Sequence, residues 1–506
     1  MAGAGRVIAL QTEGPPQPDF AESADSGLAR ELAPVLAEHP GESAFGLLQH
    51  GPAALLARAV LADLATSTID VQYYIYEDDF TGVLLTQKLL EAADRGVRVR
   101  ILLDDNNLRR SDEDLHLLTA HPNIEIRVVN PYRIRARWFR PVELLLRFSR
   151  LQRRMHNKIF TVDGTAGIFG GRNIGDNYFD AHRSANFADF DVFVAGELIS
   201  EANGSFEAYW SHRLAMAIEK LASGQATGQE LAAARKRLRE RLARVVDFEE
   251  RYDRARAHLL DILEDPGERL IFAAAEFVVD SPDKLEPTYP GTSPVLERLQ
   301  ALWAAAHSEV LIESAYFVPH RLGARFIRHQ AEAGVRTRLL TNSLAANDVT
   351  PVHAGYAKYR RRLLKAGVEL FEFKSQAAAR HDNVPLAGAP SGASLHAKVA
   401  VFDRKITWIG SFNLDPRSAE LNSELAIVIH SDRLAAETAT MIERDLEPDR
   451  AWQLQLAPRA SGGRQIVWRG QRDDRMVRLS REPDATITQR LIVGLLRFLP
   501  SIDRLL

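Results

Sequence analysis

The sequence of 506 residues contains no cysteine. This absence excludes disulfide bonds, thiolate nucleophiles and metal sites with sulfur ligands, whereas metal sites built from histidine and carboxylates remain open. Lysine is also scarce, because only 10 of the 64 basic residues are lysine. The 64 basic and 67 acidic residues give a formal net charge of −3, so bulk charge does not favour nucleic acid as a partner. Any anion-binding site must therefore be local.

Long apolar runs are absent as well. No stretch approaches the roughly 20 apolar residues that span a bilayer, and the start of the chain, MAGAGRVIALQTEGPPQPDF, lacks a basic region followed by an apolar one. We therefore expect neither a transmembrane segment nor a cleaved leader. With 46% hydrophobic and 26% charged residues, the composition is that of a globular protein. The length predicts two to four domains.

Segments with helical and with strand periodicity alternate in the first part of the chain, and the same order occurs again in the second part. After a flexible N-terminal lead-in (residues 1–44), the pattern predicts helices over 52–66 and 82–95 and strands over 69–76 and 97–103. The same order returns with helices over 294–307 and 323–333 and strands over 310–318 and 335–340. This order is typical of an α/β fold with a mostly parallel or mixed sheet covered by helices.

The two series are similar in sequence, which indicates a duplicated domain. AADRGVRVRILLDDNN around Gly96 parallels QAEAGVRTRLLTNSLA around Gly334. We expect a first lobe over residues 45–228 and a second over residues 266–447. Between them, residues 229–265 form a charged, Arg-rich helical insertion or linker with a solvated face. A C-terminal extension, residues 448–506, follows the second lobe and ends in an amphipathic helix.

One chemical motif occurs in both copies. Met155-His-Asn-Lys-Ile-Phe-Thr-Val-Asp163 and Leu395-His-Ala-Lys-Val-Ala-Val-Phe-Asp403 both have the spacing His-x-Lys-x4-Asp, and the two copies are offset by 240 positions. With 15 histidines and 10 lysines in the chain, chance predicts only about 0.3 His-x-Lys pairs. The same offset relates Gly170-Gly-Arg-Asn173 to Gly410-Ser-Phe-Asn413. A repeated hairpin explains this pattern.

The residue types in this motif suit phosphate chemistry. His and Lys at i and i+2 of a strand project from one face, and Asp163 and Asp403 begin the following turn, for which we favour a structural role over direct chemistry. A neutral imidazole can attack phosphorus and a charged one can donate a proton, so two imidazoles can divide these tasks. Lysine and asparagine side chains donate to non-bridging phosphate oxygens, and such chemistry requires no metal.

These motifs resemble those of the phospholipase D superfamily. Within it, RMHNKIFTVD with GGRNIGDNYFD, and SLHAKVAVFD with GSFNLDPRSAELNSE, are similar to the bacterial cardiolipin synthase group and most similar to its C type. The resemblance covers about Phe45 to Ser431. It implies an α/β fold of two pseudo-twofold-related α/β/α lobes, with mixed sheets flanked by helices, that share one active site.

The resemblance also implies roles for individual residues. His156 would be the nucleophile that forms a phosphatidyl-histidine, and His396 would protonate the leaving alcohol and activate the incoming one. Glu424 would orient His156, and Asp191 would orient His396, each across the lobes. The full set of candidate catalytic residues is His156, Lys158, Asp163, His396, Lys398, Asp403, Asn173, Asn413, Asp191 and Glu424. Candidate substrate-binding residues are Gly171, Ser411, Arg153 and Arg154, and no metal or cofactor is expected.

Two segments have the composition of a membrane-facing surface. Residues 132–154 carry eight arginines and one glutamate, interleaved with Trp138, Phe139 and Phe148. In the tail, 487–506, a helical stripe of Leu491, Ile492, Leu495, Leu496 and Leu499 precedes Pro500. Both stripes could instead pack on the protein's own core, and the Arg-aromatic run could bind a nucleic-acid backbone.

Together these features favour synthesis of cardiolipin by transphosphatidylation. Phosphatidylglycerol would be the acceptor, and phosphatidylethanolamine or phosphatidylglycerol the donor, on the cytoplasmic side of a bacterial inner membrane to which the protein binds peripherally. The same catalytic residues would serve a hydrolase acting on phospholipid or nucleic acid, because the acceptor is selected by pocket shape and water exclusion. A silent scaffold is disfavoured because both sets of motif residues are complete. Whether an accessory protein is needed stays open.

Overall fold

The computed structural model describes residues 26–106, 112–135, 140–182, 185–224, 226–243, 248–376, 392–459 and 461–496. The chain forms two compact units, each of which is described by itself. The first comprises residues up to Phe179, Asp191–Gly291 and Leu421–Leu425. The second comprises Asp180–Phe190, Thr292–Glu420 and the chain from Ala426 onwards.

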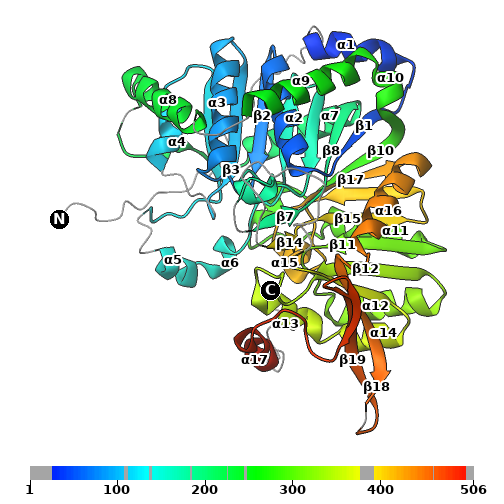
Figure 1. The fold of residues 1–506 in the computed structure, drawn as a ribbon. Coiled ribbons are helices and arrows are strands. Elements are labelled where there is room, and N and C mark those ends of the chain that lie inside the picture. Colours follow the sequence, from blue (N-terminus) through cyan, green and yellow to red (C-terminus); the bar gives the residue numbers. More distant parts are fainter. Residues whose placement is uncertain are drawn as a thin grey trace. The chain divides into compact units, whose positions relative to one another are not determined.

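The first unit is built on a mixed sheet in the order β10-β1-β8-β6-β5-β2-β3-β4-β9 (Figure 1). Strands β2, β3 and β4 are parallel to one another, and the remaining pairs are antiparallel. This confirms the mixed sheet expected from the alternating helix and strand pattern. The strands are β1 (Ser43–Leu48), β2 (Thr68–Tyr73), β3 (Arg98–Asp104), β4 (Ile124–Val129), β5 (Ile159–Val162), β6 (Ala166–Gly170), β8 (Asp191–Gly196), β9 (Ala215–Ala217) and β10 (Ile271–Val279).

Helices cover this sheet. α2 (Gly51–Leu64) packs on β1 and β5, α3 (Phe80–Asp94) on β3, and α7 (Leu198–Trp210) on β5, β8 and β10. α3 begins at the N-cap Asp79, whose side chain accepts the N–H of Gly82, and Gly96 follows its end with a φ of 97°. The helix and strand boundaries of α2, β2, α3 and β3 agree with the predicted elements to within a few residues.

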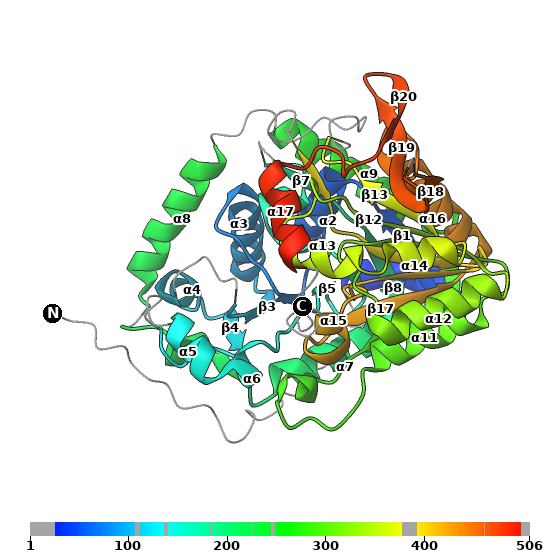
Figure 2. The same cartoon turned by 90° about the horizontal axis from the view of Figure 1, so that it is seen from below.

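The Arg-rich segment is part of the first unit rather than a separate linker. It forms α8 (Gly228–Leu242), which packs on α3 and α4 (Asp112–Leu118), and α9 (Phe248–Glu264), which packs on α2 (Figure 2). Arg235 of α8 forms an ion pair with Asp94 at 2.6 Å. The following chain also stays in this unit, because β10 pairs with β1, so the predicted lobe boundary at residue 266 is wrong.

Folded structure begins earlier than residue 45. α1 (Gly27–Ala37) starts at the N-cap Ser26, whose hydroxyl accepts the N–H of Ala29, and it buries Leu28 and Leu32. The helix contains Pro34, which made it difficult to predict from composition. Within the predicted lead-in, residues 1–25 lie outside the described residues, and residues 26–44 are folded.

The second unit repeats the arrangement of the first. Its sheet has the order β17-β16-β15-β11-β12-β13-β18-β19-β20, in which β11, β12 and β13 are parallel. The run from β17 to β13 has the same order and directions as the run from β8 to β4 in the first unit, which confirms the duplication. The strands are β11 (Glu309–Ser314), β12 (Arg336–Asn342), β13 (Glu369–Phe373), β15 (Lys398–Phe402), β16 (Ile406–Gly410), β17 (Leu425–His430), β18 (Ala451–Pro458), β19 (Arg464–Arg472) and β20 (Arg475–Leu479).

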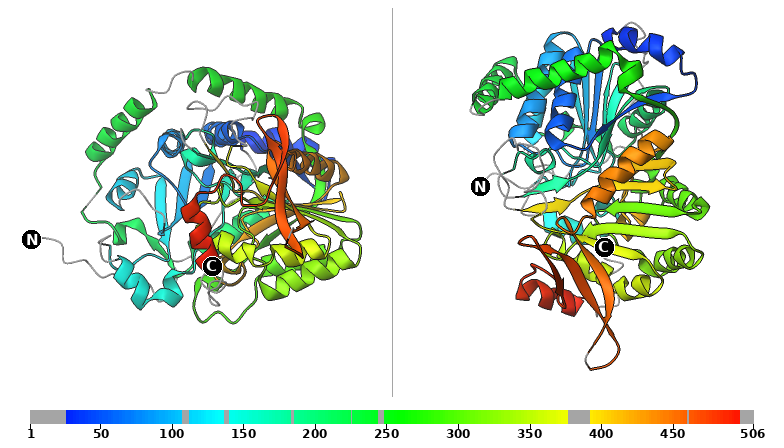
Figure 3. Two further views of the ribbon diagram at one scale, coloured as in Figure 1. Left: turned by 60° about the horizontal axis from the view of Figure 1, so that its bottom comes forward. Right: turned by 45° about the vertical axis from the view of Figure 1, so that its right-hand side comes forward.

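The C-terminal region is integrated into the second unit instead of forming an extension. Strands β18, β19 and β20 continue the sheet beyond β13, and Figure 3 shows β18 and β19 as a long orange-to-red ribbon. α17 (Ile487–Leu496) packs on α13 (Thr350–Ala357). Val493 of α17 is buried, whereas Leu491 and Leu495 are 63% and 73% exposed. Leu499 and Pro500 lie outside the described residues.

A short segment from each repeat lies in the unit built by the other repeat. β7 (Asn186–Ala188) pairs in parallel with β14 (Ala393–Leu395) in the second unit. In the first unit, Ser423 forms a parallel bridge with Met155. Sequence order therefore does not define the units, and both exchanged segments run beside a motif histidine. Within the described ranges, no helix has both the length and the apolar character to cross a bilayer.

Candidate active site

The histidine of the first motif is held in place by backbone hydrogen bonds. His156 lies three residues before β5, and its N–H donates to the carbonyl of Ser423 at 2.9 Å. The N–H of Ser423 donates in turn to the carbonyl of Arg154 at 3.0 Å. His156 is 7% exposed, and the ring of Tyr74 packs edge-on against it with a centroid distance of 5.0 Å. These contacts fix both the backbone and the ring plane of His156.

A buried carboxylate orients the imidazole of His156. Nδ1 of His156 lies 2.8 Å from Oε2 of Glu424, which is fully buried. An ionised carboxylate only accepts hydrogen bonds, so the ring proton lies on Nδ1 and the lone pair on Nε2. The N–H of Glu424 donates to Asp280 at 3.1 Å, and Asp280 forms an ion pair with Lys284 at 2.7 Å. The expected contact between Glu424 and His156 is present.

The second motif repeats this geometry inside the second unit. Nδ1 of His396 lies 2.6 Å from Oδ2 of Asp189, and the N–H of His396 donates to the carbonyl of Ala188 at 2.7 Å. His396 is 8% exposed, and Asp189 is 2% exposed. The ring of Phe187 lies 5.4 Å from that of His396. Each imidazole therefore has one buried carboxylate partner, the arrangement that sets the tautomer of a catalytic base.

The carboxylate beside His396 is Asp189, and the prediction of Asp191 is wrong. Asp191 is fully buried in the first unit, where it accepts from Nη2 of Arg58 at 2.8 Å and from the N–H of Arg172 at 3.2 Å. The chain passes from the second unit to the first between Phe190 and Asp191, at the start of β8. Two aspartates two residues apart therefore serve different units.

The motif lysines lie beside their histidines. Nζ of Lys158 donates to the carbonyl of His156 at 2.5 Å and lies 5.7 Å from the ring centre of Tyr74. Nζ of Lys398 lies 2.8 Å from Nδ1 and 3.2 Å from Nε2 of His396, and it also donates to the carbonyl of that residue. The ammonium of Lys398 and a protonated Nδ1 are both donors and cannot hydrogen-bond to each other. We therefore assign the Nδ1 proton of His396 to the shorter contact, which is the one with Asp189. Each motif thus places a cation next to its imidazole.

The motif aspartates anchor the neighbouring strands. Asp163 accepts from the N–H groups of Thr66, Ser67 and Thr68, which lead into β2. Asp403 does the same for the residues that lead into β11, His307, Ser308 and Glu309. Partial burial acts to raise the pKa of Asp403, but hydrogen bonds from the backbone N–H groups of Glu309 and His307 and from the hydroxyl and N–H of Ser308 outweigh it and lower this pKa to about 2. The structure supports the expected structural role of both aspartates.

The other candidate residues have mixed surroundings. The side-chain amide of Asn173 accepts from the N–H of Ile75 and donates to the hydroxyl of Tyr178. Oδ1 of Asn413 is buried and has no hydrogen-bond partner among the described residues. Gly171 and Ser411 are buried in the turns after β6 and β16. Whether any of them contacts a phosphate stays a prediction.

The two candidate arginines face different surroundings. Arg153 donates to the carbonyl of Lys284 at 2.9 Å. Arg154 is buried, with its guanidinium 3.4 Å from Asp104 and 5.2 Å from the ring centre of Tyr132. These contacts make Arg154 an internal ion-pair partner, so the structure does not support its prediction as a substrate ligand.

Two positioning residues were missed by the sequence analysis. Asp104 ends β3 and accepts the N–H of Met155 at 3.0 Å, and Asn342 ends β12 and accepts the N–H of Leu395 at 2.8 Å. Each therefore holds the residue directly before a motif histidine. The signal was present in the aligned segments around Gly96 and Gly334, because a polar side chain occupies the same place in both.

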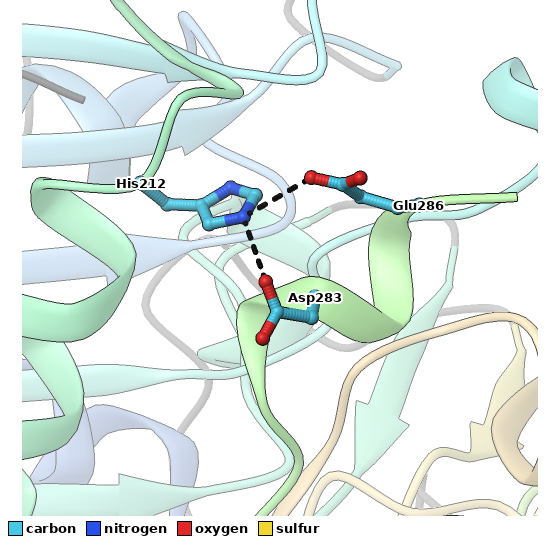
Figure 4. Close-up of side chains that lie close together, drawn as sticks. All are labelled: His212, Asp283 and Glu286. Carbon is cyan, nitrogen blue, oxygen red and sulfur yellow. Dashed lines mark hydrogen bonds and ion pairs between the residues drawn. The ribbon is translucent and has the colours of Figure 1, made fainter. Parts of the chain in front are cut away.

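Among the parts of the chain that the structure describes, one group has the composition of a metal site: His212, Asp283 and Glu286 (Figure 4). Nε2 of His212 lies 3.3 Å from Asp283 and 3.5 Å from Glu286, and Arg213 forms an ion pair with Glu286. Nδ1 of His212 accepts the N–H of Leu214 at 3.3 Å, which places the ring proton on Nε2. Since that proton is directed at the carboxylates and Arg213 already balances one of them, this group fits an ion-pair cluster better than a metal site.

Comparison with known proteins identifies the family. Residues 61–210 and 299–446 match the family described as cardiolipin synthase, PLD-like domain. The chain is 39% identical to cardiolipin synthase C of Escherichia coli (strain K12) over 485 residues, which cover 94% of this chain and 98% of that protein. It is 26% identical over 400 residues to cardiolipin synthase B of the same strain, covering 77% of this chain and 79% of that protein.

A solved structure supports the fold. The phosphatidylserine synthase of Haemophilus influenzae Rd KW20 superposes with a TM-score of 0.53 at 13% identity, covering 79% of this chain and 86% of that chain. This likeness concerns the architecture alone. Both lobes with their motifs are accounted for by the family match, and the chain therefore belongs to the cardiolipin synthase family of phospholipase D-like enzymes.

Proposed function

We propose that this enzyme transfers phosphatidyl groups between phospholipids and that its product is cardiolipin. The relationship to cardiolipin synthase C supports a phospholipid phosphatidyltransferase. The observation that carries the proposal is the repeated pair of imidazole and buried carboxylate, His156 with Glu424 and His396 with Asp189. Phosphatidylglycerol is proposed as the acceptor, and phosphatidylethanolamine or phosphatidylglycerol as the donor.

The proposed reaction has two steps. Nε2 of His156 attacks the donor phosphorus, the N–P bond forms, and the bond from phosphorus to the headgroup oxygen breaks as His396 protonates that oxygen. His396 then removes a proton from a hydroxyl of phosphatidylglycerol, which attacks the same phosphorus and releases His156. Glu424 stabilises the positive charge on His156 as the N–P bond forms, and Lys158 and Lys398 neutralise the phosphate oxygens.

Two exposed apolar surfaces support contact with a membrane. In the first unit, α5 (Arg140–Leu146) and α6 (Phe148–Leu151) expose Leu145 and Leu146 by 80% and 76%, next to Arg147. Trp138 and Phe139 lie outside the described residues. In the second unit, α17 exposes Leu491, Ile492 and Leu495. Leucines beside arginines suit the boundary between acyl chains and anionic headgroups, so we propose peripheral binding through these helices.

The decisive experiment uses purified protein and mixed vesicles of phosphatidylglycerol and phosphatidylethanolamine with separately labelled headgroups. We expect cardiolipin to form, with release of the label that identifies the donor, and His156→Ala to abolish the product. With donor lipid labelled in its acyl chains, denaturation in SDS at neutral pH during turnover should trap the labelled phosphatidyl group on the parent protein but not on His156→Ala. Phosphatidic acid as the sole product would instead identify a hydrolase, and nicking of plasmid DNA at a comparable rate would identify a nuclease.

A further inference from the structure

An apolar pocket of about 240 Å³ lies in the second unit between α11 (Pro294–Ala305), α12 (His320–Glu332) and α15 (Pro416–Glu420). Figure 2 shows α11 and α12 side by side. Four aromatic side chains line the pocket: Trp303, Phe317, Phe326 and Phe412. The lining includes no lysine or arginine, and its charged members are Asp415 and Glu420. The pocket is therefore suited to an apolar ligand and not to a free anion.

The pocket shares lining residues with a smaller hollow at the second motif. This hollow of about 10 Å³ shares Leu299, Phe412 and Leu414 with the pocket and is also lined by Lys398. Phe412 and Leu414 flank Asn413, and the carbonyl of Leu414 accepts the N–H of Val318 at 2.7 Å. A ligand in the pocket would therefore lie next to the motif that the proposed reaction uses to hold phosphate.

The first unit fills the equivalent place with charged groups. The alignment of Gly170–Asn173 with Gly410–Asn413 makes Arg172 equivalent to Phe412, and counting back from β2 and β11 makes Arg58 equivalent to Leu299. Arg58 lies 2.8 Å and Arg172 3.5 Å from Asp191. The ladders Gly170↔Asp191 and Gly410↔Ala426 place an alanine where the first unit has this aspartate. A buried ion cluster in one repeat is thus replaced by apolar side chains in the other.

A bulky side chain is lost at the same place. The alignment also makes Phe179, whose ring lies 5.4 Å from the guanidinium carbon of Arg58, equivalent to Ala419, which lines the pocket.

We propose that this pocket binds a fatty acyl chain of the phospholipid substrate. This inference rests on the proposed function. A diacyl phospholipid provides in one molecule the apolar chain that the aromatic lining fits and a phosphate for Lys398. The asymmetry between the repeats implies that the second unit, and not the first, binds an acyl chain in this way.

Binding can be measured without turnover in the His156→Ala background. Phosphatidylglycerol with brominated acyl chains, dispersed in detergent micelles, quenches nearby tryptophans, and subtraction of the Trp303→Phe signal isolates Trp303. We expect strong quenching of Trp303 in the parent background. The quenching should be lost in Ala419→Phe, which restores the bulk found in the first unit. It should be retained in the control Ala436→Phe, at an exposed position of α16 (Asp432–Asp445). Gly323→Leu, on the pocket wall, provides a second filling variant if Ala419→Phe does not fold.

Measurements of enzyme turnover provide a second test of the pocket. With His156 intact, Ala419→Phe should raise KM for dioctanoyl substrates at least about tenfold while leaving KM for dibutyroyl substrates nearly unchanged, because each buried methylene contributes to binding. If Trp303 were not quenched while cardiolipin synthesis was normal, the proposed acyl-chain site would be wrong and the proposed function would still hold. Quenching without any phosphatidyl transfer would support an acyl site but contradict the proposed function. Quenching that survives both filling variants would place the chain elsewhere and also overturn the pocket.

Discussion

The carboxylate of Asp104 accepts the backbone N–H of Met155 at 3.0 Å, and this contact fixes the residue that precedes His156. Asp104 is fully buried, with the guanidinium of Arg154 3.4 Å away. Burial, only partly offset by Arg154 and by backbone hydrogen bonds, raises the pKa of Asp104 to about 6. The equivalent residue in the second unit, Asn342, makes the same kind of contact without a charge.

Asp104→Asn should therefore change how stability depends on pH. A carboxyl whose folded-state pKa is raised stabilises the fold below its unfolded pKa near 3.8, and this contribution is lost as pH rises through about 6. We expect the parent to lose about 3 kcal/mol relative to Asp104→Asn between pH 3.5 and pH 7. Urea unfolding of both proteins across this range measures the difference. If the free energies of unfolding of the two proteins changed in parallel with pH, the raised pKa of Asp104 would be contradicted.

Asp189 and Asp191 should behave differently when each is replaced by asparagine. Asp189→Asn removes the charge that supports His396, so it should lower kcat and alter its pH profile while the protein stays folded. Asp191→Asn leaves Arg58 buried without its counter-charge and should cost about 3–5 kcal/mol of stability. Turnover and urea unfolding of both variants test this pair. A stable Asp191→Asn protein with impaired kcat would reverse the two roles.

The catalytic groups of the two motifs should depend on one another during turnover. Glu424→Gln should lower kcat by roughly 10²- to 10⁴-fold, because the amide supports neither the tautomer nor the charge of His156. Glu424→Asp, which keeps the charge, should recover part of this loss. If His156 and His396 serve one reaction, the double alanine variant should lose little more activity than either single variant. If the activity losses of the two single variants multiplied in the double variant, His156 and His396 would belong to two independent sites.

Asp403 should support stability and not chemistry. Its folded-state pKa of about 2 lies below the ordinary value of 3.8, so its contribution is present above pH 4 and is lost as pH falls through 2. Asp403→Asn should reduce stability at pH 7 by about 1–2 kcal/mol, since the amide still accepts from part of the backbone. Activity per folded molecule should stay near that of the parent. A large fall in kcat at unchanged stability would show that Asp403 takes part in the reaction.

The sequence was sufficient for the repeated fold and for one of the two orienting carboxylates. Strict spacing located both motifs and their turns, because hairpins preserve residue offsets. The orienter of His396 was misassigned because periodicity cannot show where a chain leaves one unit for another, and here it does so between Phe190 and Asp191. The boundary at residue 266 was wrong for another reason, because β10 pairs with β1 and keeps the chain up to Gly291 in the first unit. Asp104 and Asn342 were missed because their task depends on a contact with a distant backbone N–H.

The exchanged segment that carries Glu424 also constrains synthesis of the protein. Glu424 follows His156 by 268 residues, so a growing chain on the ribosome contains the histidine long before its carboxylate partner has been translated. Translation that stops before residue 424 leaves the histidine without the group that sets its tautomer. The contact that orients His156 is therefore completed only after most of the polypeptide has been made.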